Sequence, residues 1–262
     1  LQSLDKGKNP PIGKVRTMSS GQVIADIFPY NIYQRLLLNG IRAEVWMQDG
    51  VTADNFTENI AKVYKSDDQS GQVSLVLGGG NIASIPPLDV LDRLFGHKSV
   101  CVLKVHPVND YLKEIFDSIF EDFVSAGYLQ IVSGDADVGN YLCQHEYIDH
   151  IHITGGAKTF ESILFGSGSD GQERKNRGEP QLDKSVSAEL GCVTPTIVVP
   201  GPWSKADLKF QAENIATQKL HNGSFNCIAS QILILPEIWD AADDLLADVK
   251  KTISSVIPRE PY

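Results

Sequence analysis

One cysteine and one glutamate are spaced in a way that suits covalent chemistry on a carbonyl group. Cys227 lies in the turn-like segment 220–229, and Glu189 lies 38 positions earlier, between Ala188 and Leu190. A Cys227 thiolate can attack a carbonyl carbon, and a Glu189 carboxylate can later activate water to hydrolyse the resulting thioester. A lone cysteine is more often a small buried hydrophobic residue, so the hypothesis depends on the surrounding sequence.

Polar residues and glycines follow three strand-like segments. Gly80-Asn81 ends the first, Lys104 ends the second, and Thr154-Gly155-Gly156 ends the third. The Asn81 amide and the Lys104 ammonium are hydrogen-bond donors, and a helix after Gly156 would point its N-terminal amides toward a phosphate. Each feature also has a plainer explanation, namely a tight turn, a solvated strand-end lysine or a strand-to-helix connection. The fingerprint G-x-G-x-x-G does not follow any of these three segments.

The elements that must position these residues alternate between strands and helices. The patterns predict strands at 73–77, 100–105, 129–132, 151–154, 196–199 and 231–235. They predict helices at 87–94, 110–126, 204–220 (with Ser204 as N-cap) and 238–253. They also predict a short helix that ends at 144 and a helix that begins near 158. This rhythm favours an α/β fold: a Rossmann-like parallel sheet with helices on both faces, plus the start of a second α/β catalytic domain. Ligands bind beyond the carboxyl ends of such strands.

The rest of the chain is less regular. Segment 166–185 is polar and rich in glycine, and we expect a surface loop there. Before residue 72, the patterns predict a helix at 31–38, a strand at 43–47 and a helix at 53–63.

Composition narrows the classes of partner. The chain has 262 residues, 42% of them hydrophobic and 21% charged, with a net charge of −10. These values are typical of a soluble globular protein and argue against nucleic-acid binding. We expect no membrane partner, because no apolar run reaches the roughly 20 residues of a membrane helix. Four scattered cysteines indicate neither a metal site nor a disulfide framework, and no signal peptide is recognisable, so we expect a cytoplasmic protein.

The motifs, in order, resemble those of the aldehyde dehydrogenase superfamily. Gly80-Asn81, Lys104 in Val-Leu-Lys, Thr154-Gly155-Gly156, Glu189-Leu190-Gly191 and the Asn222…Cys227 segment stand where that superfamily has its own motifs. The spacing of 23 positions from Asn81 to Lys104 is also that of the superfamily.

The resemblance implies a role for each residue. Cys227 would be the nucleophile, Glu189 the base that activates water, and Asn81 a donor to the oxyanion. Lys104 would bind the cofactor's ribose or phosphate, and Thr154, Gly155 and Gly156 would complete the cofactor site. The cofactor would be NAD or NADP, the substrate a small aldehyde or acyl compound, and no metal would be needed. A homo-oligomer of a full-length parent is also compatible with the resemblance.

Several positions depart from the superfamily pattern. The acid that usually follows the lysine motif is missing at His106-Pro107, which makes NADP as acceptable as NAD. The predicted loops resemble those of the fatty-acyl-CoA reductase branch. Only 35 residues follow Cys227, so we expect a truncated chain: a cofactor-binding domain with an N-terminal extension at 1–188, and a partial catalytic domain at 189–262.

Three functions remain open at this stage. The leading hypothesis is an NAD(P)-dependent oxidoreductase that converts an aldehyde to a carboxylic acid through a thioester on Cys227. The second is an acyl-CoA reductase that forms an aldehyde with NADPH. The third is a non-catalytic cofactor-binding module. Glu189 favours the first, the loops favour the second, and the short C-terminal part favours the third.

Overall fold

The computed structural model describes residues 12–66 and 70–258. By its internal contacts the chain divides into two compact units, Leu1–Gln69 and Ser70–Tyr262. All the candidate site residues belong to the second unit. The predicted functional boundary at 188/189 lies inside that unit and stays a prediction.

The first unit contains a three-stranded antiparallel sheet in the order β1-β2-β3. Its elements are β1 (Val15–Thr17), β2 (Val23–Phe28), α2 (Ile32–Leu37), β3 (Ala43–Trp46), η1 (Phe56–Asn59) and η2 (Lys62–Tyr64). The predicted helix at 53–63 is wrong, because two short 3₁₀ turns occupy this stretch. The Asn55 side chain accepts from the Thr52 amide and donates to the Gly50 carbonyl, and such local bonds compete with an α-helix.

A five-stranded parallel sheet forms the centre of the second unit, in the order β6-β5-β4-β7-β8. Its strands are β4 (Gln72–Leu77), β5 (Ser99–Lys104), β6 (Leu129–Val132), β7 (His150–Gly155) and β8 (Ser185–Leu190). The strand order reverses at β4, which pairs with β5 on one side and with β7 on the other. Open α/β sheets bind ligands beside such a reversal, beyond the carboxyl ends of the strands.

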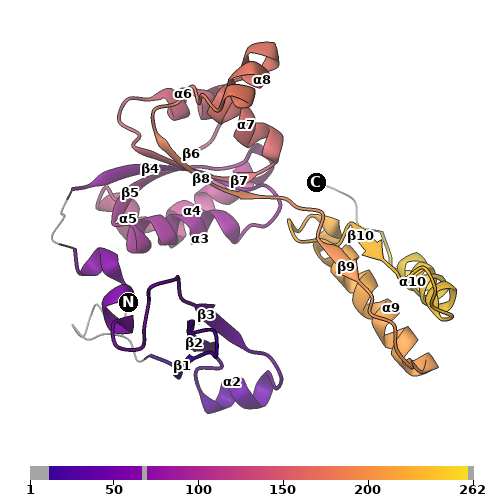
Figure 1. Ribbon diagram of the computed structural model, residues 1–262. Helices are drawn as coiled ribbons and strands as arrows, with labels where there is room; N and C mark the ends of the chain where they lie inside the picture. The colour runs from indigo at the N-terminus through magenta and orange to yellow at the C-terminus, as the bar shows by residue number, and fades with distance from the viewer. Residues whose placement is uncertain (1–11, 67–69, 259–262) are drawn as a thin grey trace. The chain divides into compact units, whose positions relative to one another are not determined.

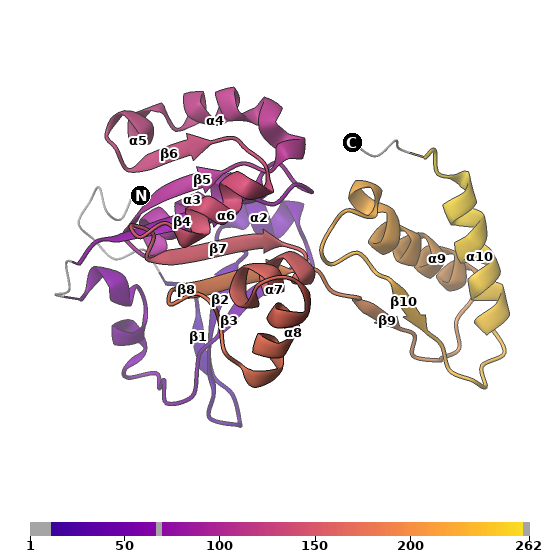
Figure 2. The ribbon, with the colours of Figure 1, turned by 90° about the horizontal axis from the view of Figure 1, so that it is seen from above.

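Helices cover both faces of this sheet (Figures 1 and 2). One face carries α3 (Ile85–Leu91), η3 (Asp92–Gly96), η4 (Pro107–Leu112), α4 (Lys113–Ile119) and α5 (Glu121–Ser125). The other carries α6 (Ala136–Gln144), α7 (Ala157–Phe165) and α8 (Gly168–Arg177). The sheet with helices on both faces, predicted from the alternating pattern, is confirmed.

Successive residues of the central strand bury their side chains on opposite faces. Val76 joins Leu103, Phe116 and Ile131 in the core beneath α3 to α5. Its neighbour Leu75 belongs to the opposite core, which is built on β7 and α6. Both side chains are fully buried, as expected for a strand inside a parallel sheet.

The remainder of the second unit is a smaller α/β layer. Here β9 (Pro195–Ile197) pairs in parallel with β10 (Ile232–Ile234), beside α9 (Lys205–Leu220) and α10 (Ala242–Ser255) (Figure 2). Ser204 caps α9 as predicted: its hydroxyl accepts from the Asp207 amide, and the Asp207 carboxylate accepts from the Ser204 amide. Buried apolar side chains from both helices, including Ala212 and Leu245, form the core.

Half of the segment predicted as a loop at 166–185 is a helix. α8 covers ten of its residues, has Asp170 in its first turn and basic residues in its last turn, and ends at Gly178 in the left-handed conformation. The acidic start and basic end favour the helix dipole, and Gly178 terminates the last turn. None of the helices in the described ranges has the length and apolar character needed to cross a membrane.

Candidate active site

A cavity of about 430 Å³ lies at the carboxyl edge of the five-stranded sheet. Residues after four strands contribute to its wall, together with the loop that carries Cys227. The lining residues are Gly79, Gly80, Asn81, His106, Val108, Thr154, Gly155, Gly156, Glu189, Gly191, Phe225 and Cys227. Six of the seven predicted site residues therefore line one cavity, and the seventh, Lys104, does not.

The β7–β8 pairing sets Glu189 beside the predicted cofactor residues. Thr154 is in register with Glu189, and Gly155 is in register with Leu190. Because opposed residues of paired strands share a face of the sheet, Thr154 and Glu189 present their side chains on the same face. Glu189 is exposed at the cavity edge, where water can reach its carboxylate.

The Cys227 loop is attached to the sheet edge through asparagine side chains. Asn81 donates from Nδ2 to the Phe225 carbonyl at 2.8 Å, and Asn222 donates from Nδ2 to the Asn81 carbonyl at 3.0 Å. An asparagine amide carries two N–H bonds, so the bond to Phe225 leaves one further donor on Asn81. The sequence separates Asn81 from Cys227 by 146 positions, and the fold brings both to one cavity.

Three consecutive left-handed residues shape this loop. Asn222, Gly223 and Ser224 have φ values of 53°, 60° and 70°. Such backbone is uncommon for asparagine and serine, and strained conformations of this kind cluster at functional sites. Cys227 lies three positions after Ser224 and is exposed. Its carbonyl accepts from the Cys192 amide at 3.2 Å and lies 3.4 Å from the Cys192 Sγ.

Burial divides the four cysteines into two classes. It raises the pKa of Cys101 to about 12 and that of Cys143 to about 11. These two thiols therefore stay protonated at neutral pH and pack as core residues. The exposed cysteines are Cys192 and Cys227.

The start of α7 has the features of a phosphate site. Gly156 is the N-cap, no side chain in the described part of the chain caps this end, and no acidic residue lies in the first turn. The free amides and the helix dipole attract an anion. A Cβ atom on Gly156 would meet nothing within 4 Å, so the glycine leaves open space at the cavity wall. These features fit the pyrophosphate of a dinucleotide.

Lys104 lies at the end of β5, away from the cavity wall. Its side chain is buried, and this burial lowers the pKa of Lys104, while Asp110 and Asp135 oppose that effect. From the same strand end, His106 lines the cavity, with its ring against Gly80. Burial, and secondarily the charge of Lys104, lowers the pKa of His106, so this imidazole is neutral at neutral pH. The predicted contact of Lys104 with a cofactor stays a prediction.

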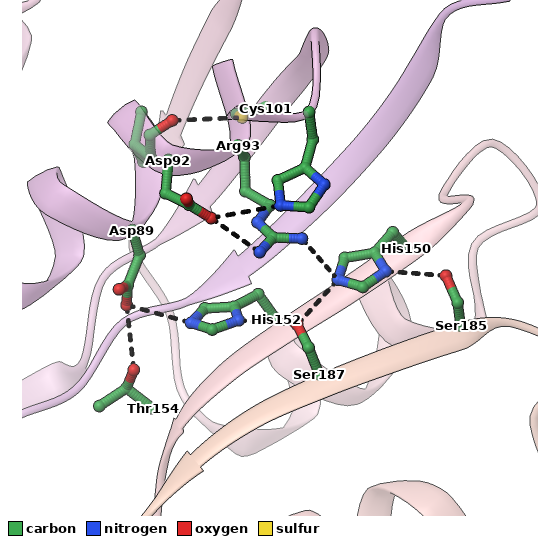
Figure 3. A network of polar contacts seen from close by, with 11 residues as sticks. Asp89, Asp92, Arg93, Cys101, His150, His152, Thr154, Ser185 and Ser187 are labelled. Carbon is green, nitrogen blue, oxygen red and sulfur yellow. Dashed lines mark hydrogen bonds and ion pairs between the residues drawn. The ribbon is translucent and has the colours of Figure 1, made fainter. Parts of the chain in front are cut away.

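A network of polar side chains begins at Thr154 and continues along one face of the sheet (Figure 3). The Thr154 hydroxyl donates to Asp89 Oδ2 at 3.0 Å, and His152 Nε2 lies 3.6 Å from the same oxygen. His152 Nδ1 contacts the Ser187 hydroxyl at 2.8 Å, and that hydroxyl lies 2.9 Å from His150 Nε2. All of these strand residues lie on one face, because the serines of β8 are in register with the histidines of β7.

The far end of this polar network contains an ion pair between Arg93 and Asp92. Arg93 Nη1 lies 3.2 Å from His150 Nε2, and Arg93 Nη2 donates to Asp92 Oδ2 at 2.7 Å. The Ser185 hydroxyl lies 2.7 Å from His150 Nδ1. Burial, then the charges of Arg93, His152 and His97, lowers the pKa of His150 to about 4. His150 is therefore neutral at physiological pH.

Asp89 and the network behind it are absent from the residues predicted from the sequence. A signal was available, since His150, His152 and Thr154 alternate with Ile151 and Ile153 on a strand that is otherwise buried. Strands covered on both faces are normally apolar throughout. Their polar partners come from segments more than 30 positions away and carry no local signal. Among the described residues, no group of three or more His, Cys, Asp or Glu could hold a metal ion.

The fold agrees with the comparisons to known proteins. The aldehyde dehydrogenase family model matches residues 98–261. This is more than half of the chain, so the chain belongs to the aldehyde dehydrogenase family. The matched region contains Lys104, the Thr154-Gly155-Gly156 motif, Glu189 and Cys227, whereas Asn81 lies before it.

Individual relatives are distant and longer. Coniferyl aldehyde dehydrogenase from Pseudomonas sp. (strain HR199 / DSM 7063) is 22% identical over 183 residues, which are 70% of this chain and 34% of that protein. The HpcC structure from Thermus thermophilus has a TM-score of 0.56 at 20% identity, over 71% of this chain and 33% of that one. An E. coli structure described as an NADP-dependent enzyme has a TM-score of 0.50 at 19% identity, over 71% and 35% of the two chains. This chain thus spans about a third of the length of these relatives.

Proposed function

We propose that this chain provides the nucleotide-binding and nucleophile-bearing part of an NAD(P)-dependent aldehyde dehydrogenase. The observation that carries the proposal is the shared cavity. A thiol, a carboxylate, a side-chain amide and an uncapped helix N-terminus from four distant parts of the sequence meet there. Membership of the family supports this activity, and the NADP dependence of the E. coli neighbour supports a nicotinamide cofactor.

The chemistry begins at Cys227. Its thiolate adds to the aldehyde carbon, and the remaining Asn81 N–H and the Cys227 backbone N–H donate to the oxygen that becomes negative. Thr154, Gly155 and the start of α7 would hold a nicotinamide nucleotide, which would supply the acceptor for the hydride from the former aldehyde carbon. Glu189 then takes a proton from a water molecule, which attacks the thioester and releases the carboxylic acid and the Cys227 thiolate.

The nucleotide part of the site uses the glycine-rich strand ends. The amides at the start of α7 bind the pyrophosphate, and Thr154 and Gly155 form the adjoining wall. The acid that would reject a 2′-phosphate is missing from the segment after Lys104. We therefore expect NAD and NADP to bind with similar affinity. In functional terms, residues 1–188 carry the nucleotide site and residues 189–262 carry the nucleophile.

The experiment measures nucleotide binding first and chemistry second. Titration of protein fluorescence with NAD and NADP should give dissociation constants within about tenfold of each other, a difference below about 1.4 kcal/mol. Gly156→Asp, which puts a carboxylate at the start of α7, should weaken both nucleotides. Gly139→Asp, which also has open space for a Cβ atom but lies on α6, is the matched control. If neither nucleotide binds, the proposal is refuted. Reduction of acyl-CoA by NADPH without aldehyde oxidation would assign the chemistry to an acyl-CoA reductase.

A further inference from the structure

The orientation of Thr154 is controlled by Asp89. The Thr154 hydroxyl is bonded to Asp89 Oδ2 on α3, 65 positions earlier in the sequence. The Thr154 methyl group, Cγ2, faces Gly79 on the opposite side: a Cβ atom on Gly79 would lie only 2.9 Å from it. The hydrogen bond therefore turns the polar atom toward α3 and leaves an apolar group next to a glycine of the cavity wall.

Asp89 is itself held in a largely buried position. Its side chain is 15% exposed, and that of His152, whose Nε2 lies 3.6 Å from the accepting oxygen, is 10% exposed. His152 is fixed on its other side by Ser187, which also contacts His150. Asp89 is thus enclosed by its neighbours, although His152 Nε2 makes no hydrogen bond to it, and an acceptor in a restricted position favours one rotamer of the threonine that donates to it.

We propose that Asp89 is a positioning residue for the nucleotide site and acts through Thr154. By accepting the Thr154 hydrogen bond, it keeps the threonine methyl group toward the cavity and its hydroxyl away from it. An apolar wall of this kind contacts the flat face of a nicotinamide ring without competing for hydrogen bonds. This inference rests on the proposed function in one respect, that the cavity receives a nicotinamide nucleotide.

Substitutions at Thr154 separate the methyl group from the hydroxyl. Thr154→Val keeps the methyl group next to Gly79 and replaces the hydroxyl with a second methyl group. Its dissociation constant for NADP should therefore stay within about twofold of the wild-type value. Thr154→Ser keeps the hydroxyl and lacks the methyl group, so binding should weaken about tenfold. The opposite ranking would show that the hydroxyl contacts the nucleotide, and it would overturn the proposal.

Substitutions at Asp89 test the positioning. Asp89→Ala should weaken NADP binding about tenfold in the wild-type background and have no further effect in Thr154→Val, because the two residues act as one unit. Asp89→Asn keeps an acceptor for the Thr154 hydroxyl and should bind NADP with the wild-type affinity. Asp92→Ala is the matched control, since Asp92 contacts Arg93 and not Thr154. An equal loss from Asp89→Ala in both backgrounds would overturn the action through Thr154.

A measurement on the nucleotide-free protein tests whether Asp89 orients Thr154, separately from whether the cavity binds a nucleotide. Three-bond couplings to the ¹³C-labelled Thr154 methyl group report its χ1 rotamer in the free protein. We expect one rotamer in wild type, Asp89→Asn and Asp92→Ala, and averaging in Asp89→Ala. A single rotamer in Asp89→Ala would refute the positioning. If the wild type binds neither NAD nor NADP, the proposed function and the nucleotide role of Asp89 both fail, while the couplings still decide whether Asp89 orients Thr154. Circular dichroism shows whether each variant is folded. If Asp89→Ala does not fold, the NADP affinities of Thr154→Val, Thr154→Ser and Asp89→Asn test the proposal.

Discussion

The neutral state of His150 predicts a loss of stability in mild acid. The pKa of His150 is about 4 in the folded protein, whereas an unfolded histidine titrates near 6.5. Above pH 6.5 neither state holds a proton at this ring. Between pH 6.5 and about 4 the unfolded chain takes up a proton that the folded protein excludes, so stability falls as the pH falls through this window.

The size of the effect follows from these two values. At pH 5 almost every unfolded His150 is protonated and almost every folded one is neutral, which corresponds to about 2 kcal/mol relative to pH 7. Because the ring is only partly buried, solvent screening reduces this to about 1 kcal/mol. His150→Gln removes the titrating group. Its free energy of unfolding should therefore depend less on pH than the wild-type value, by about 1 kcal/mol between pH 7 and pH 5.

Urea unfolding followed by circular dichroism at pH 7, 6 and 5 provides the measurement. His221→Gln is the control, because this exposed histidine is not among the charged groups that lower the pKa of His150. The control should keep the pH dependence of the wild type. If His150→Gln and the wild type lose the same stability between pH 7 and pH 5, then His150 is not held neutral and the reasoning fails.

Three further outcomes are expected. Limited iodoacetamide labelling with peptide mapping should modify Cys227 first and leave Cys101 and Cys143 unmodified, because burial raises the pKa of both core thiols; early labelling of a core thiol would sink the nucleophile assignment. Glu189→Gln in a turnover-competent protein should keep a stoichiometric burst of reduced nicotinamide and lose steady-state turnover, since only thioester hydrolysis needs the base; loss of the burst as well would give Glu189 a different role. Ser204→Ala should lower the free energy of unfolding by about 1 kcal/mol in urea titrations, because it removes the cap of α9.

Local patterns were enough to predict four of the five strands of the sheet and several residues at its edge. The strand at 129–132 and the Ser204 cap were predicted at their observed positions, because apolar runs and capping residues are short-range signals. Because parallel strands end at one edge of a sheet, the same patterns predict that Gly80 and Gly156 lie near one edge, whereas the Cys227 loop was placed there by the resemblance to the aldehyde dehydrogenase superfamily. Their roles in binding and catalysis remain predictions.

The errors have a common physical cause. β8 was not predicted, because Ser185, Ser187 and Glu189 make one side of it polar, and the partners of the two serines are histidines 35 positions earlier. Asp89 was overlooked for the same reason, since its bond to Thr154 spans 65 positions. The helix α8 did carry a readable signal, because acidic and basic residues mark its two ends and Gly178 stops it. Its high glycine content concealed that signal.

The central place of β4 in the sheet determines when each strand edge becomes protected during synthesis. β4 is the first strand of the sheet to be made, and β5 can pair with one of its edges soon afterwards. Its other edge must wait for β7, which begins at His150. At roughly 5–20 residues per second, the 73 residues from Leu77 to His150 take about 4–15 s to synthesise. During this time one edge of β4 has unpaired backbone groups, and its side chains Leu75 and Val76, which are buried in the folded protein, lack part of their core. Chaperones that shield exposed strand edges on the ribosome would therefore act on this chain before residue 150 has emerged.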